Sequence, residues 1–213
     1  MNSINKTARI AGFPYLIPWV LSLTNYFLRQ SLIVPGDAAV TANNITASES
    51  LFRLSIVSDL IVQVVFVLLV LVLYKLLKPV NKNHALLMVI FFLISVPITM
   101  LNELNQFAAL LLLSGADYLT VFTSDQLQAL VPLFRGLHEY GIMIAYIFWG
   151  LWLFPLGYLV FKSGFLPKIL GVLLMIGCFG YLIDFLHSFF FTTSIRQLIC
   201  IRVGGNCYCA CGF

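Results

Sequence analysis

The chain has 213 residues, of which 61% are hydrophobic and 9% are charged, and its mean hydropathy is +1.01. This composition excludes a soluble globular protein of this size, because so few polar residues cannot cover the surface of one. The formal charge of +4 does not indicate nucleic-acid binding, because the basic residues flank apolar segments and form no basic surface. We therefore expect the lipid bilayer as the main partner and no nucleic acid.

Five long apolar segments predict transmembrane helices. Each can supply the roughly 20 residues that cross a hydrocarbon core about 30 Å thick, where a helix pairs its own backbone groups. The predicted spans are residues 10–28, 51–77, 85–113, 126–161 and 169–191. We therefore expect an all-α, polytopic transmembrane helical bundle that forms a single domain over residues 1–191.

The first segment could also be a secretory signal peptide, because Lys6 and Arg9 precede it. Pro14 and Pro18 make a poor signal-peptide core, and no suitable cleavage site follows closely. We therefore expect this segment to remain as a membrane helix that ends near Arg29.

The connections between the segments contain turn-forming residues. Residues 31–50 predict an outer loop with room for a short interfacial helix. Ser124 is the predicted N-cap of the fourth segment, with the favourable charge of Asp125 in its first turn. This segment is too long for one simple crossing, so its first part, through Glu139, is expected at or above the outer interface, and Pro155 is expected to kink it.

The distribution of charge between the two sets of segment ends predicts the orientation. Basic residues without acidic neighbours occupy one set, namely Lys6, Arg9, Lys75, Lys78, Lys82, Lys162 and Lys168. Acidic residues occupy the loops at the opposite ends, namely Asp37, Glu49, Asp117 and Asp125. The positive-inside rule places the basic ends, and with them the N-terminus, in the cytoplasm.

Eight ionisable side chains lie within the apolar segments or near their outer ends. These candidate site residues are Arg53, Asp59, Glu103, Arg135, His138, Glu139, Asp184 and His187. A charged group at the centre of a membrane helix costs about 2.5 to 3.5 kcal/mol on insertion scales, so such groups are expected to pair or to serve a function. A helical rise of ~1.5 Å per residue places several of them roughly 24 to 28 Å above the cytoplasmic boundary. We therefore expect a shared polar pocket nearer the outer face.

The charges of this predicted cluster do not balance. Two arginines face four carboxylates, so either some carboxylates keep a proton or a cation compensates them. The histidines could titrate near neutral pH or bind a metal. The candidate metal ligands are Glu103, His138, Asp184 and His187, but no compact metal motif such as H-E-x-x-H is present, and we predict no cofactor.

Residues 192–213 differ in character from the rest of the chain and end in the spacing Cys207-x-Cys209-x-Cys211. No helix of membrane length fits in this tail. The cysteines could suggest a soft-metal site, but no neighbouring His or second Cys pair completes a zinc-binding spacing.

Six sequence blocks resemble the bacterial membrane family catalogued as domain of unknown function 4386. They are KTARIAG at 6–12, PGDAA at 35–39, ASE at 47–49 followed by FR at 52–53, LKPVN at 77–81, LSGADY at 113–118 and SGFLPKILG at 163–171. The resemblance spans about residues 5–186. It implies a multi-pass protein of the bacterial cell membrane, usually with a sixth helix after the segment that ends near Asp184. The cysteine-containing tail departs from this pattern and looks like the product of a truncation or frameshift.

Three functional hypotheses follow. The first, which we favour, is an accessory, sensory or structural membrane protein with no catalytic step, in which the polar cluster maintains the fold. The second is an intramembrane metal-assisted lipid hydrolase that uses the four candidate metal ligands. The third is a small proton- or cation-coupled transporter. Two features argue against a transporter: the inner halves of the helices are almost purely apolar, and no half-helix repeat is evident.

Overall fold

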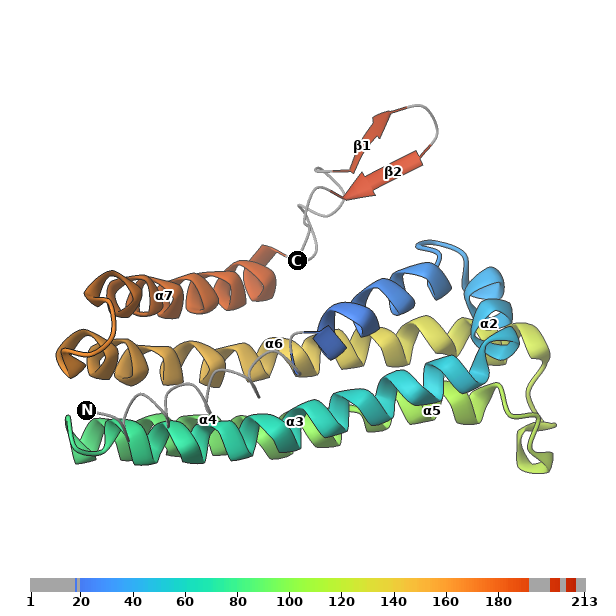
Figure 1. Ribbon diagram of the computed structural model, residues 1–213. Helices are drawn as coiled ribbons and strands as arrows, with labels where there is room; N and C mark the ends of the chain where they lie inside the picture. Colours follow the sequence, from blue (N-terminus) through green and yellow to red (C-terminus); the bar gives the residue numbers. More distant parts are fainter. Residues whose placement is uncertain (1–17, 19, 192–199, 204–205, 210–213) are drawn as a thin grey trace.

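The structure is a computed structural model that describes residue 18 and residues 20–191, 200–203 and 206–209. A first helix, residues 20–32, is followed by α2 (Ala38–Ala47), α3 (Glu49–Leu77), α4 (Lys82–Asn102), α5 (Leu104–Leu112), the 3-10 helix η1 (Asp117–Leu119), α6 (Ser124–Ser163) and α7 (Lys168–Phe191). The long helices lie side by side, whereas α2 and η1 both lie at the same end of the bundle (Figure 1). The prediction of an all-α helical bundle is confirmed.

Four helical stretches in the described part are long and apolar enough to cross a membrane. They are residues 49–77, 82–112, 124–163 and 168–190. Their outward faces are apolar, since side chains such as Leu54, Leu68 and Ile176 are about 60% exposed. In water these faces would destabilise the fold, so hydrocarbon is the solvent that suits them.

The observed helices begin and end within a few residues of the predicted segments, with two informative differences. The third segment is divided at Glu103, where α4 ends and α5 begins. The first segment, predicted as 10–28, begins among residues outside the described part. Its described portion continues to residue 32, three residues past Arg29, near which it was expected to end. This difference places Arg29 inside the bundle.

Local capping explains where the helices start. Thr123, and not Ser124 as expected, is the N-cap of α6, because its hydroxyl accepts from the Gln126 backbone N–H while the Gln126 side chain accepts from the Thr123 N–H. Asp37 caps α2 by accepting a hydrogen bond from the Val40 N–H at 2.9 Å. The predicted outer loop therefore contains a helix.

The charged ends of the helices are segregated as the sequence predicts. The α3–α4 and α6–α7 turns lie at the same end of the bundle, opposite α2 and η1 (Figure 1). The end with the two turns carries Lys75, Lys78, Lys82, Lys162 and Lys168. Because α6 has 40 residues, it is about 60 Å long at ~1.5 Å per residue, and its acidic end extends beyond a hydrocarbon core about 30 Å thick.

The helix α6 is the central element, with α4 and α7 packed along it. Beside α4, Trp152 of α6 contacts Phe92 with ring centroids 5.2 Å apart. Beside α7, Gly157 lies so close to Gly171 that a Cβ on Gly157 would be 2.6 Å from the Gly171 carbonyl oxygen. Small residues at such a crossing let membrane helices pack backbone to backbone. This close van der Waals packing stabilises the pair in lipid, where the hydrophobic effect does not drive helices together.

Beyond α7, β1 (Cys200–Val203) and β2 (Asn206–Cys209) form an antiparallel pair in which Cys200 is opposite Cys209. Cys211 lies outside the described residues. The assignment of residues 192–213 as a truncated or frameshifted tail, and of 1–191 as a single domain, stays a prediction.

We predict that Gly157→Leu lowers the thermal unfolding temperature of the detergent-solubilised protein, because the new side chain forces α6 and α7 apart. Gly180→Leu is the matched control, since a Cβ at Gly180 has nothing within 4 Å. Differential scanning fluorimetry of both variants measures the effect. Equal unfolding temperatures for the two variants would show that the close approach of α6 and α7 does not stabilise the bundle.

Candidate functional site

An ion pair joins the first helix to α3. The guanidinium of Arg29 donates a short hydrogen bond to the Asp59 carboxylate. One turn earlier, the Asn25 amide donates to the other Asp59 oxygen at 2.8 Å and to the Ser55 carbonyl at 3.2 Å. Asn25 and Arg29 share one face of their helix, as Ser55 and Asp59 do on α3, because each pair is four residues apart. The two helices therefore meet through a polar seam.

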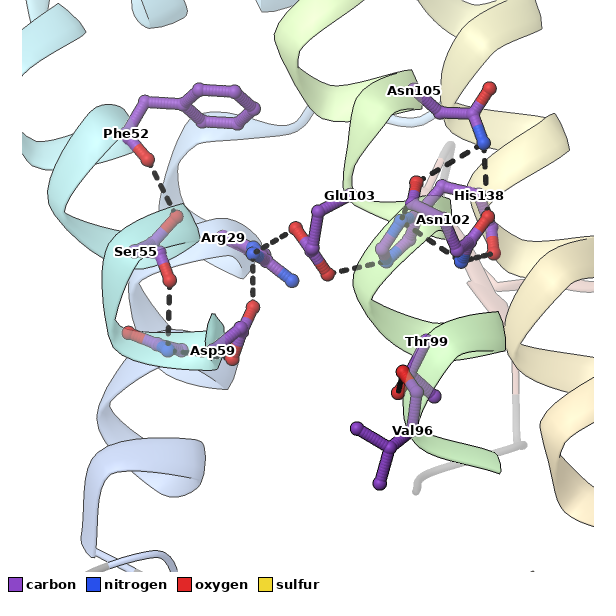
Figure 2. A network of polar contacts seen from close by, with 11 residues as sticks. Arg29, Phe52, Ser55, Asp59, Val96, Thr99, Asn102, Glu103, Asn105 and His138 are labelled. Carbon is purple, nitrogen blue, oxygen red and sulfur yellow. Dashed lines mark hydrogen bonds and ion pairs between the residues drawn. The ribbon is translucent and has the colours of Figure 1, made fainter. Parts of the chain in front are cut away.

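Glu103 lies at the centre of the site, between Arg29 and His138 (Figure 2). Its side chain is 7% exposed, with Oε2 3.8 Å from an Arg29 nitrogen and Oε1 4.0 Å from His138 Nε2. It occupies the junction between α4 and α5, where its N–H bonds to the Met100 carbonyl at 3.3 Å in a tightened turn. The break in the helix thus positions a carboxylate between the first helix and α6.

Asn102, next to Glu103, joins α4 to α6. Its amide donates to the His138 carbonyl at 2.8 Å and lies 3.2 Å from His138 Nδ1, and its oxygen accepts from Asn105 at 2.9 Å. Gly141, one turn after His138, makes room for this side chain, because a Cβ there would overlap Asn102. His138 is therefore held from the Nδ1 side, and its Nε2 faces Glu103.

These groups form one end of a cavity of about 480 Å³. The polar end contains Arg29, Asp59, Glu103 and His138, with Gln63 and Thr99 nearby. The opposite walls are apolar and aromatic and contain Val62, Phe66, Phe92, Ile142, Trp149, Trp152, Leu153 and Tyr181. Glu103 lies about 30 Å along α4 from Lys82 at ~1.5 Å per residue, so the polar end is near the boundary of the hydrocarbon core away from the basic ends.

The structure brings three of the eight candidate residues together, namely Asp59, Glu103 and His138. Arg53 instead pairs with Glu49 at 2.7 Å on an exposed face of α3. Arg135 pairs with Glu139 at 3.1 Å, and both line a second cavity of about 520 Å³ between α6 and the α2 region. A single pocket shared by all eight is not observed.

Asp184 and His187 lie at exposed positions of α7, a helix that packs mainly against α6. Of the four candidate metal ligands, the structure therefore places only Glu103 and His138 close together. Within the described residues, no three His, Cys, Asp or Glu side chains are grouped as metal ligands.

The sequence-based reasoning missed Asn25 and Arg29 as members of the site. Their signal was present, because two polar residues four positions apart in an apolar helix mark a buried polar face. Because the first segment was expected to end near Arg29, this guanidinium was not counted among the residues inside the bundle. Arg29 supplies the positive charge that was expected from Arg53 and Arg135. Among the described residues, the site therefore contains one guanidinium and two carboxylates.

Residues 10–203 match a protein family described as Domain of unknown function (DUF4386). The chain belongs to this family. An uncharacterized protein from Archaeoglobus fulgidus is 35% identical over 136 residues, which are 63% of this chain and 67% of that protein. No solved structure matches. The DUF4386 match includes the first helix and every helix from α2 to α7, so the expected family is confirmed.

We predict that Asn102→Leu destabilises the protein by about 1–3 kcal/mol, because the buried hydrogen bond from the Asn102 amide to the His138 carbonyl and its contact with His138 Nδ1 are lost. Asn83→Leu, at an exposed position in the first turn of α4, is the control and is expected to change stability by less than about 0.5 kcal/mol. Chemical denaturation in detergent, followed by circular dichroism, measures both values. A loss for Asn102→Leu no larger than that for Asn83→Leu would contradict this role of Asn102.

Proposed function

We propose that this DUF4386 protein is a multi-pass protein of the bacterial cell membrane with an accessory, sensory function and no catalytic step. Its basic helix ends face the cytoplasm, in agreement with the positive-inside rule. Its polar network, formed by Arg29, Asp59 and Glu103, holds the first helix against the bundle beside the cavity of about 480 Å³, the central cavity. Occupancy of the cavity would then be read out through the position of this helix.

The observation that carries this proposal is the contact of Arg29 with Asp59 and Glu103. It joins the first helix to α3 and to the α4–α5 junction through charged groups that are mostly withdrawn from solvent, with side-chain exposures of 20%, 23% and 7%. Such groups favour one arrangement of helices, because any other arrangement leaves a charge unpaired in a medium of low polarity.

A sensory function fits the position of these charges on the cavity wall. Arg29, Asp59 and Glu103 line the cavity and also connect three helices. A ligand that interacts differently with two positions of the first helix would shift the balance between them. Elements held by a few specific contacts are suited to such displacement.

The two alternative functions receive less support. The hydrolase hypothesis requires several ligands around one metal, and its candidates Asp184 and His187 lie away from Glu103 and His138. The transporter hypothesis has the cavity in its favour. It also requires a polar route to the basic end, where the interior contains apolar residues such as Val70, Leu77, Met88 and Leu159.

The proposal predicts that Arg29→Met and Asp59→Leu each reduce accumulation in the membrane and the unfolding temperature, whereas the double variant recovers much of both. Removing one partner of a buried ion pair costs about 3–5 kcal/mol, and replacing both partners by apolar residues is often neutral. The partial exposure of this pair and the nearby Glu103 place the expected single-variant losses at the lower end of that range. Quantitative immunoblotting of membranes and thermal melts measure the four proteins.

The matched control is the exposed pair, tested as Glu49→Leu and Arg53→Met, which is expected to contribute less than about 1 kcal/mol. Single variants at Arg29 and Asp59 that accumulate and melt like the parent protein would contradict the structural role of the network. Loss of a bound metal without loss of stability in Glu103→Gln or His138→Ala would favour the hydrolase.

A further inference from the structure

The cavity of about 480 Å³ contains buried polar atoms whose hydrogen-bonding capacity the described part of the chain does not meet. Glu103 Oε2 and Arg29 Nε are both buried and have no hydrogen-bond partner among the described residues. The Glu103 side chain is more than nine-tenths buried and lines the cavity. A buried oxygen of this kind is costly to leave unpaired, so a group that donates to it would be stabilised there.

The charges at the polar end specify the sign of that group. Among the described residues, Arg29 is the one guanidinium that lines the cavity, beside the carboxylates of Asp59 and Glu103. Asp59 takes the closer contact with Arg29, whereas Glu103 is 3.8 Å from it. His138 also lines the cavity, with Nε2 4.0 Å from Glu103 Oε1. With His138 neutral and both carboxylates ionised, the site is short of one positive charge, and the unmet charge is at Glu103.

The apolar walls specify the body of the ligand. Phe66, Phe92 and Trp152 form a continuous aromatic wall, with ring centroids 6.0 and 5.2 Å apart, and Trp149 and Tyr181 also line the cavity. The Trp149 indole N–H already donates to Ser95 at 3.2 Å. Aromatic faces attract cations and pack well against apolar groups. The volume of about 480 Å³ is within the range of small-molecule sites.

We propose that this cavity binds an amphiphilic organic cation, a protonated amine carried on an aromatic or aliphatic body. The ammonium donates to Glu103 Oε2 and supplies the missing positive charge, and the body lies against Phe66, Phe92, Trp149 and Trp152. Arg29 keeps its contact with Asp59. This inference rests on the proposed sensory function and names the class of ligand whose occupancy of the cavity the first helix would report, whereas the structural role of the network requires no ligand.

The structure argues against the other simple ligand classes. An anion would bring a third negative charge next to Glu103 and Asp59, at a cost that a medium of low polarity increases. A purely apolar molecule would fill the cavity but leave Glu103 Oε2 unpaired. A neutral alcohol of the same shape could donate to Glu103 without supplying charge, and it is therefore the discriminating comparison.

The test compares 4-phenylbutylamine with 4-phenylbutan-1-ol, which share the same body and differ in the charge of the head group. Binding to the purified, detergent-solubilised full chain at neutral pH is followed by tryptophan fluorescence, since Trp149 and Trp152 line the cavity. We expect the parent protein to bind the amine at least about tenfold more tightly than the alcohol, an effect of about 1.4 kcal/mol. Equal affinities for the two compounds would overturn the proposal.

The variant Glu103→Gln keeps the shape of the side chain and removes its charge, and it is expected to abolish the preference for the amine. Glu139→Gln removes a carboxylate that does not line this cavity, and it is expected to keep the preference. A folded Glu103→Gln protein that still prefers the amine would overturn the proposal.

If Glu103→Gln does not fold, Ile142→Phe provides the test, because it fills part of the cavity without changing charge. A loss of amine affinity of about tenfold or more supports the site, and unchanged affinity overturns it. The accumulation and melting experiments on Arg29 and Asp59 require no ligand, so a failure of the amine site is distinguishable from a failure of the structural role.

Discussion

The arrangement of the first helix depends on the need to pair the Arg29 guanidinium. An arginine placed among apolar helices keeps its charge, so the chain must bring a carboxylate to it. Asp59 provides this carboxylate from α3, with Asn25 hydrogen bonded to the same group. Glu103 adds a second carboxylate from the α4–α5 junction. Three separate segments are therefore held in register by one cation, while their remaining contacts are mostly apolar and less selective.

The break at Glu103 and the glycines of α6 make this arrangement possible. At the tightened turn between α4 and α5, Asn102 points toward His138 and Glu103 toward Arg29 (Figure 2). Gly141 leaves the space that Asn102 occupies. Farther toward the basic end, the aromatic packing and the close approach of α6 to α7 form a conventional membrane interface. The polar end therefore provides specificity, and the apolar end provides most of the packing area.

The sequence was sufficient to predict the helices, because hydrocarbon thickness sets their length and lysines mark one set of their ends. It also identified Asp59, Glu103 and His138 as buried groups that require partners. It could not identify those partners, because which helix faces which depends on packing between residues far apart in the chain. A spacing of three or four residues shows that Asp184 and His187 share a face. It does not show whether that face meets the bundle or the lipid.

Amide hydrogen exchange of the first helix, measured by mass spectrometry in the parent protein and in Asp59→Asn, tests whether the Arg29–Asp59 contact holds this helix against the bundle. Removal of the Asp59 charge releases the first helix from α3 while α4, α6 and α7 keep their contacts. We therefore expect residues 20–32 to lose protection in the variant and the core of α6 to stay protected. Equal protection of residues 20–32 in the two proteins would show that the Arg29–Asp59 contact does not hold this helix in place.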